Sequence, residues 1–234
     1  MLNYKLVNHL KTEYKTNYPF PHIVVDNFMD GIYLKKAISQ LDLVDWGYDE
    51  GEEIMGEHQR KKYFAPHYVD GFYGLPEYVR NVLGFLNSPE VIAYLEELTG
   101  INGLIPDWGF YGGGLHRIKR GGKLSVHADY NFHPITKLHR RVNLLLYLND
   151  EWKEEWGGDL QLWSKDLKNC IKKIEPIFNR AVIFSITSDA YHGHPGDLMS
   201  PEDVDRYSFA LYYFTEERPA DEVRDPHMAL FHHV

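Results

Sequence analysis

Cysteine is almost absent from this sequence, because Cys170 is the only one among 234 residues. A single thiol excludes an intramolecular disulfide framework and a zinc site built from several thiolates. The sequence also lacks a run of 18 apolar residues and a hydrophobic signal region near residue 1. We therefore expect a soluble, cytoplasmic protein with no membrane partner.

Positive charge is scarce as well. The chain has 25 Lys and Arg residues against 34 Asp and Glu residues, a formal net charge of −9, and no run of basic residues. A negative surface repels a phosphate backbone, which argues against a nucleic-acid partner. The charge instead favours a peptide, a protein or a small molecule as the substrate, and it leaves the oligomeric state open.

Apolar and aromatic residues are plentiful. They make up 44% and 15% of the chain, which is enough for a substantial core. Apolar residues recur at helical spacing over about residues 30–43, which predicts a helix there. Pro76 and Pro89 can each open a further helix at its first position, with Ser88 as the cap of the second and Gly100 as its end.

The second half of the chain contains many short apolar segments separated by glycines. Such segments predict strands joined by turns, and their number favours a sandwich or a barrel. The predicted strands lie in Gly112–Val126, Arg141–Asn149, Gly157–Trp163, Arg180–Thr187 and Arg206–Phe214. We expect Gly112–Val126 to hold short strands with tight turns, and Arg141–Asn149 to be buried on both faces.

A possible metal site begins at His127 and Asp129. Residues i and i+2 of a strand point to the same face, so both side chains can reach one metal ion. Chance placement of histidine and aspartate in this composition predicts about one such pair, so the pair alone is weak support. A later histidine, His192 or His194, would complete two histidines and one carboxylate, the ligand set typical of non-haem Fe(II) oxygenases.

The segments around these residues carry a resemblance. Gly112–Thr215 resembles the double-stranded β-helix (jelly-roll) domain of 2-oxoglutarate- and Fe(II)-dependent dioxygenases, and most closely their prolyl 4-hydroxylase-like branch. The matching segments, in order, are the glycine turn, HADYN, RRVNLLLYLN, WGGDLQLW, NRAVIF, YHGHP and RYSFALYY. The resemblance implies a mainly β, α+β fold in one domain, residues 1–234. Its jelly-roll core would span about residues 104–216, with the helices of about residues 1–103 packed on one sheet.

The resemblance also implies the metal ligands and the cofactors. His127, Asp129 and His192 would bind Fe(II) and form the catalytic centre. His192 is preferred over His194 because it takes the family's distal-histidine position ahead of the Gly-His-Pro turn. The implied cofactors are Fe(II), the cosubstrate 2-oxoglutarate and O2, with ascorbate as an additional reductant.

A buried carboxylate of 2-oxoglutarate needs a positive partner, because an unpaired charge inside a barrel is costly. A guanidinium offers a two-pronged partner. In the family this arginine lies on the strand after the distal histidine, a position that Arg206 occupies here. By the same resemblance Tyr147 reaches the cosubstrate, and Asn143 is a weaker candidate on the same strand face.

The implied activity is hydroxylation of prolyl residues in a peptide or protein. Two alternatives stay open: hydroxylation of a free amino acid or another small metabolite, and a non-catalytic jelly-roll module that binds a metal or carbohydrate. Residues 47–62 are polar and glycine-bearing, which fits either a solvated loop or a lid. We place substrate choice in residues 47–75, whose aromatic side chains could contact a pyrrolidine ring or belong to the core; they are Tyr63, Phe64, Tyr68, Phe72 and Tyr73.

Overall fold

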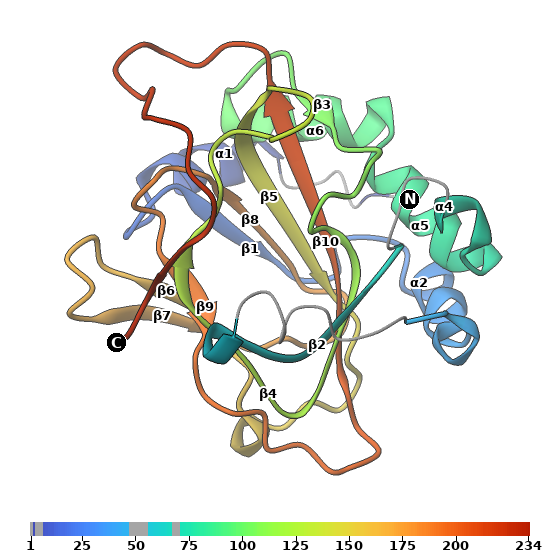
Figure 1. The fold of residues 1–234 in the computed structure, drawn as a ribbon. Helices are drawn as coiled ribbons and strands as arrows, with labels where there is room; N and C mark the ends of the chain where they lie inside the picture. The colour runs from blue at the N-terminus through green and yellow to red at the C-terminus, as the bar shows by residue number, and fades with distance from the viewer. Residues whose placement is uncertain (1, 3–6, 47–55, 67–70) are drawn as a thin grey trace.

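The computed structural model describes residue 2 and residues 7–46, 56–66 and 71–234. It consists of a curled antiparallel sheet with helices gathered on one side (Figure 1). The helices are α1 Val7–Thr16, α2 Gly31–Ile38, α4 Gly71–Gly74, α5 Glu77–Leu86 and α6 Pro89–Thr99, with 3₁₀ turns η2 Leu41–Leu43, η3 Gly56–His58 and η4 Glu154–Trp156. The strands are β1 His22–Val25, β2 Gln59–Ala65, β3 Ile105–Pro106, β4 Gly114–Ala128, β5 His139–Tyr147, β6 Leu160–Trp163, β7 Cys170–Ile174, β8 Ala181–Ser185, β9 His192–His194, β10 Arg206–Thr215 and β11 Leu230–His232.

The long strand β4 is the centre of the sheet. The main strand order is β1-β8-β5-β10-β4-β9-β6-β7, with β2 and β11 also paired to β4 and β3 paired to β10. The first part of β4 pairs with β10, and its last part pairs with β9 and β11. Because one strand changes partners along its length, the sheet curls into the double-stranded β-helix that the sequence predicts.

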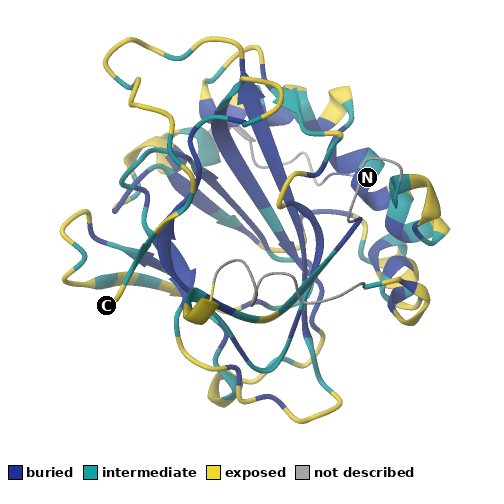
Figure 2. Ribbon diagram, in the orientation of Figure 1, coloured by how far each residue is buried: buried dark blue, intermediate teal, exposed yellow. Residues whose placement is uncertain are grey.

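Strands β5 and β10 are buried on both faces, as predicted for the apolar run in β5. One face packs against the helices in the main core, and Figure 2 shows most of both strands in the colour of buried residues. Its residues on the two strands are Val142, Leu144, Leu146, Phe209, Leu211 and Tyr213. Full burial of one such side chain stabilises the fold by roughly 1.5–3 kcal/mol. The opposite face of the two strands is formed by the alternate residues, and it lines a pocket.

The predicted helix ends are largely confirmed. Helix α6 begins at Pro89, the Ser88 hydroxyl accepts a hydrogen bond from the Val91 amide at 3.5 Å, and Gly100 ends the helix with a φ of 75°. Pro76 lies one residue earlier than predicted, as the cap of α5. The helix predicted over residues 30–43 is shorter, because α2 ends at Ile38 before the turn η2.

Two local predictions were wrong. Within Gly112–Val126, residues 114–126 belong to one continuous strand, β4, rather than to several short ones, and Gly112 and Gly113 lie before it. Its Gly121 amide and Gly122 carbonyl bond to the backbone of Leu198, and a Cβ at Gly122 would lie only 2.6 Å from Ile118 Cγ2. The glycines therefore allow a close backbone approach without ending the strand.

The second correction concerns residues 47–62, interpreted above as a loop or lid. Gln59–Lys62 is part of β2, which pairs with β4. The lid hypothesis for residues 47–55, and any role of residues 67–70, lies outside the described residues. Among the described helices, none has both the length and the apolar character needed to cross a membrane.

Candidate active site

A pocket of about 450 Å³ opens on the face of β5 and β10 that points away from the helices. Asn143, Leu145 and Tyr147 of β5 all line it, as the alternation of a strand predicts. Asn143 and Tyr147 are four residues apart, which corresponds to about 13 Å along a strand. The pocket therefore has two ends, one beside Asn143 and the other beside Tyr147.

At the first end, two strands bring His127, Asp129 and His192 together. His127 lies near the end of β4, Asp129 directly follows the strand, and β9 places His192 opposite His127 in antiparallel register. One ligand atom from each of the three side chains lies within 4.8 Å of the others. The Nε2 atoms of His127 and His192 are each 3.4 Å from an oxygen of the Asp129 carboxylate.

Both histidines present the same ring nitrogen to this centre. The Nδ1 atom of His127 is 2.9 Å from the Ser125 carbonyl, and that of His192 is 2.9 Å from the Ala190 carbonyl. A carbonyl can only accept, so each Nδ1 carries a proton and each Nε2 keeps its lone pair. Burial lowers the pKa of His192 to about 4, although Asp129 opposes the shift. Neutral imidazoles with oriented Nε2 atoms suit a metal ion.

The Asp129 carboxylate is held as an anion. Its Oδ2 atom accepts a hydrogen bond from Asn143 Nδ2 at 2.8 Å and lies 3.0 Å from a guanidinium nitrogen of Arg140. Burial alone would raise the pKa of Asp129, but Arg140, His192 and His127 outweigh it and keep that pKa well below its ordinary value. Two imidazoles and one ionised carboxylate are a suitable donor set for Fe(II).

Arg140 was not expected at this position. The sequence places Arg140 and Arg141 equally well near the pocket mouth or on the surface. Instead, Arg140 is 1% exposed, and its guanidinium carbon lies 3.5 Å and 4.4 Å from the ring centroids of Tyr212 and Tyr130. Arg141 is also buried, at 7% exposure, and it lies 3.2 Å from Glu222, whose side chain is 41% exposed. No local sequence pattern indicates that Arg140, on the next strand β5, is the partner of Asp129.

At the second end, Arg206 and Tyr147 lie together, as the resemblance implies. The Arg206 Nε donates to the Gly158 carbonyl at 2.8 Å, and its Nη2 is 3.4 Å from the Tyr147 hydroxyl. Arg206 is buried, which lowers its pKa, and among the described residues Asp159 opposes this shift without forming an ion pair with it. A Cβ at Gly158 would lie 3.1 Å from Arg206 Cδ, so the WGGD segment leaves space for this side chain. A buried cation without a counterion suits an anionic cosubstrate.

His194, the alternative third ligand, is not a member of the group formed by His127, Asp129 and His192. It is buried in the wall of the pocket, and neither ring nitrogen has a hydrogen-bond partner among the described residues. Asn143, the weaker cosubstrate candidate, is bonded to Asp129 and accepts from Arg140 Nε at 3.0 Å. Its amide therefore positions the carboxylate of the metal centre.

The mouth of the pocket includes residues that the sequence did not indicate. Met228, Ala229 and Phe231 line it from the last part of the chain, and the Phe231 ring centroid is 5.2 Å from that of His127. β11 is only three residues long, too short for a periodic signal.

The aromatic residues predicted in the substrate region are divided. Phe64 lines the pocket, whereas Phe72 stacks on Phe110 at 5.6 Å and Tyr73 is exposed. The Tyr63 ring lies under the Lys119 amine, and Tyr68 lies outside the described residues.

Comparison with known proteins agrees with this geometry. Residues 113–214 match the model of the 2OG-Fe(II) oxygenase superfamily. A prolyl hydroxylase from Trichoplax adhaerens, solved with a hypoxia inducible factor peptide, superposes with a TM-score of 0.64 at 22% identity, over 90% of both chains. A Pseudomonas putida prolyl-4-hydroxylase gives a TM-score of 0.59 at 14% identity, over 91% of this chain and 100% of the other.

HygX from Streptomyces hygroscopicus is also similar in fold. Its structure with nickel, 2-oxoglutarate and hygromycin B gives a TM-score of 0.56 at 13% identity, over 89% of this chain and 92% of the other. The part of the chain that matches the model of the 2OG-Fe(II) oxygenase superfamily, residues 113–214, contains all three members of the His-Asp-His group. The chain is therefore similar to this superfamily in sequence motif, fold and metal-binding side chains. Within it, the fold is like that of the prolyl hydroxylases.

Proposed function

We propose that this protein hydroxylates prolyl residues in a peptide or protein, with His127, Asp129 and His192 as the Fe(II) ligands. The observation that carries the proposal is one pocket with two ends, with a His-Asp-His centre at one end and at the other a buried Arg206 that forms no ion pair with a described carboxylate. When bound, the metal and 2-oxoglutarate would activate O2, with one oxygen atom entering succinate as 2-oxoglutarate loses CO2 and the other forming the hydroxyl group on the target carbon.

The residues of the chain perform the positioning. Arg206 and the Tyr147 hydroxyl would hold the far carboxylate of 2-oxoglutarate, since both point donors into a buried part of the pocket. Asn143 and Arg140 hold the Asp129 carboxylate in one orientation, and the Ser125 and Ala190 carbonyls fix the two imidazoles. These contacts keep the metal ligands prearranged without a change in the fold.

The pocket mouth supports a ring-shaped, weakly polar target group. Phe64, Tyr111 and Phe231 contribute to its wall, and such aromatic faces can pack against a pyrrolidine ring. A cavity of about 450 Å³ must also contain 2-oxoglutarate, so we infer that a prolyl side chain enters while the rest of the peptide stays outside. The similar Trichoplax adhaerens enzyme was solved with a peptide, which fits this mode of binding.

The test is succinate release from 2-oxoglutarate with Fe(II), measured with and without proline-rich peptides, together with mass analysis of the peptides for one added oxygen. We expect peptide-stimulated succinate release and a matching mass increase. His192→Ala should abolish both, while the control His194→Ala keeps most of the activity. The reverse pattern would move the third ligand to His194. Succinate release that no peptide stimulates would contradict the prolyl substrate.

A free amino acid or another small metabolite is the second candidate substrate. A pocket of about 450 Å³ can contain a small molecule, and HygX, which is similar in fold, was solved with hygromycin B. The same assay with free amino acids separates the two, because a small-molecule enzyme hydroxylates the free compound without flanking residues.

We also propose that residues 1–234 form one domain and that the protein works in the cytoplasm. The first proposal is supported by a main core that joins the helices to β5 and β10, and predicts a single unfolding transition. The second is supported by the single cysteine, and localisation of a tagged chain in its host cells would test it.

A further inference from the structure

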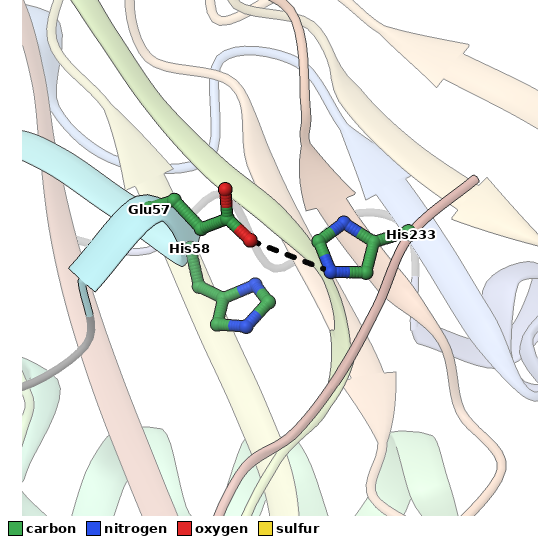
Figure 3. A group of neighbouring side chains, drawn as sticks. All are labelled: Glu57, His58 and His233. Atoms are coloured by element: carbon green, nitrogen blue, oxygen red, sulfur yellow. Dashed lines mark ion pairs between the residues drawn. The ribbon is translucent and has the colours of Figure 1, made fainter.

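A second group of metal-binding side chains lies outside the pocket. Glu57 and His58 belong to the turn η3, and His233 follows β11 (Figure 3). One ligand atom from each lies within 4.8 Å of the others, and His233 Nε2 is 3.6 Å from a Glu57 carboxylate oxygen. The fold thus brings together three ligand-type side chains from two distant parts of the sequence.

A second, independent observation at His58 indicates that a binding partner is missing. Its Nδ1 atom is buried, yet it has no hydrogen-bond partner among the described residues. A buried polar atom without a partner costs free energy, so such atoms usually have a ligand, an ion or a water. The ring itself is fixed, because it stacks on Phe231 with 4.8 Å between centroids and 9° between planes.

Phe231 connects this group to the pocket. One of its ring neighbours is His58, and another is His127 at 5.2 Å between centroids. In the sheet, Phe231 is also the register partner of His127 in the pairing of β11 with β4. Anything that holds His233 against η3 therefore also holds Phe231 in the wall of the pocket.

We propose that Glu57, His58 and His233 bind a divalent transition metal ion of the Zn²⁺ type. Two imidazole nitrogens and one carboxylate oxygen are an established zinc donor set, which leaves a fourth position for water. The bound ion would tie β11 to η3 and would stabilise the mouth of the pocket, separately from the Fe(II) centre. Because the proposal concerns metal binding alone, it does not depend on the substrate or on the hydroxylase activity.

The test is a Zn²⁺ titration of untagged, metal-free protein by calorimetry, in a His127→Ala/His192→Ala background that cannot fill the pocket centre. We expect two equivalents in the unsubstituted chain and one in the background. Adding Glu57→Gln or His233→Ala to the background should weaken the remaining site by about tenfold or more, since a lost ligand costs at least as much as a lost supporting contact. Adding His139→Ala, a histidine outside both groups, should leave it unchanged.

A second measurement follows the strand rather than the ion. Zn²⁺ should slow amide hydrogen exchange of residues 230–232 in the background and should not do so once His233→Ala is added. If the background fails to fold, the chain with His233→Ala alone should bind one equivalent instead of two. Undiminished binding after Glu57→Gln and His233→Ala, or no second equivalent in the unsubstituted chain, would overturn the proposal.

Discussion

The two faces of β5 and β10 have different roles. One face is apolar and fully buried against the helices, with Leu144 and Phe209 at 0% exposure. The other face, offset by one residue, lines the pocket with Asn143, Tyr147 and Arg206. A strand with its side chains alternating between two surroundings can therefore stabilise the fold and position a site at the same time.

The comparison of the two faces shows how buried polar side chains are stabilised on the pocket face. Asn143, Asp129 and Arg140 satisfy one another through contacts of 2.8–3.0 Å, whereas Arg206 bonds only to neutral groups. The first set is complete within the protein, and the second is completed by a ligand with negative charge. Substitution should therefore act through stability on the apolar face and within the Asp129–Arg140 set, and through ligand binding at Arg206.

The largest expected effect falls on Arg140, which tests whether the pocket face also affects stability. Arg140→Met leaves the buried Asp129 carboxylate without its cation, which typically costs about 3–5 kcal/mol of unfolding free energy. Chemical denaturation of the metal-free protein measures this loss. Arg141→Met is the matched control, because its partner Glu222 is 41% exposed and the cost should be smaller.

Added metal should restore part of the stability lost in Arg140→Met, since a cation at the His-Asp-His group would neutralise the same carboxylate. Equal stabilities of the two arginine variants would show that Asp129 does not depend on Arg140.

Leu144 and Leu145 allow the sharpest test of the two faces, because they are neighbours on one strand. Leu144 is fully buried against the helices, whereas Leu145 lines the pocket. Leu144→Ala should lower the unfolding free energy by about 2–5 kcal/mol and leave 2-oxoglutarate affinity unchanged. Leu145→Ala should cost less stability, because the pocket already leaves one side of it without packing. Similar losses in both variants would contradict the division into two faces.

Arg206 tests the opposite prediction, a change in binding without a change in stability. Arg206→Ala should weaken 2-oxoglutarate binding by about 30-fold or more, since losing a buried charged partner costs about 2–5 kcal/mol. Calorimetric titration with 2-oxoglutarate in the presence of a divalent metal measures the affinity. The metal-free variant should unfold at least as stably as the unsubstituted protein, because it no longer buries an uncompensated cation. Unchanged affinity would remove Arg206 from the cosubstrate site.

Strand periodicity and caps made much of the fold predictable. The apolar run in β5, the caps Ser88 and Gly100 of α6 and the shared face of His127 and Asp129 all rest on local spacing. Within the site, the convergence of His192 and the placement of Arg206 beside Tyr147 followed from the family resemblance. Such resemblance carries the order of strands, which spacing alone does not.

The missed features depend on contacts between distant segments. The role of Arg140 requires knowing that two tyrosine rings enclose its guanidinium beside Asp129. The pairing of β2 and β11 with β4 likewise joins short segments far apart in the chain, for which neither length nor alternation gives a signal.

The smallest expected effect lies on neither face, at an ion pair between the end of β1 and the start of β8. Arg180 donates to Asp26 through two bonds of 2.6 and 2.9 Å, and this contact lowers the pKa of Asp26, with burial opposing it. A lowered folded-state pKa gives stability that is present above the unfolded value of about 3.9 and is lost as the pH falls through the folded value. Since Asp26 is 53% exposed, solvent screening limits the contribution to about 1 kcal/mol or less. Urea denaturation of Asp26→Asn and the unsubstituted protein should therefore show a small difference at pH 7 that shrinks towards pH 3, whereas a difference independent of pH would assign the effect to packing.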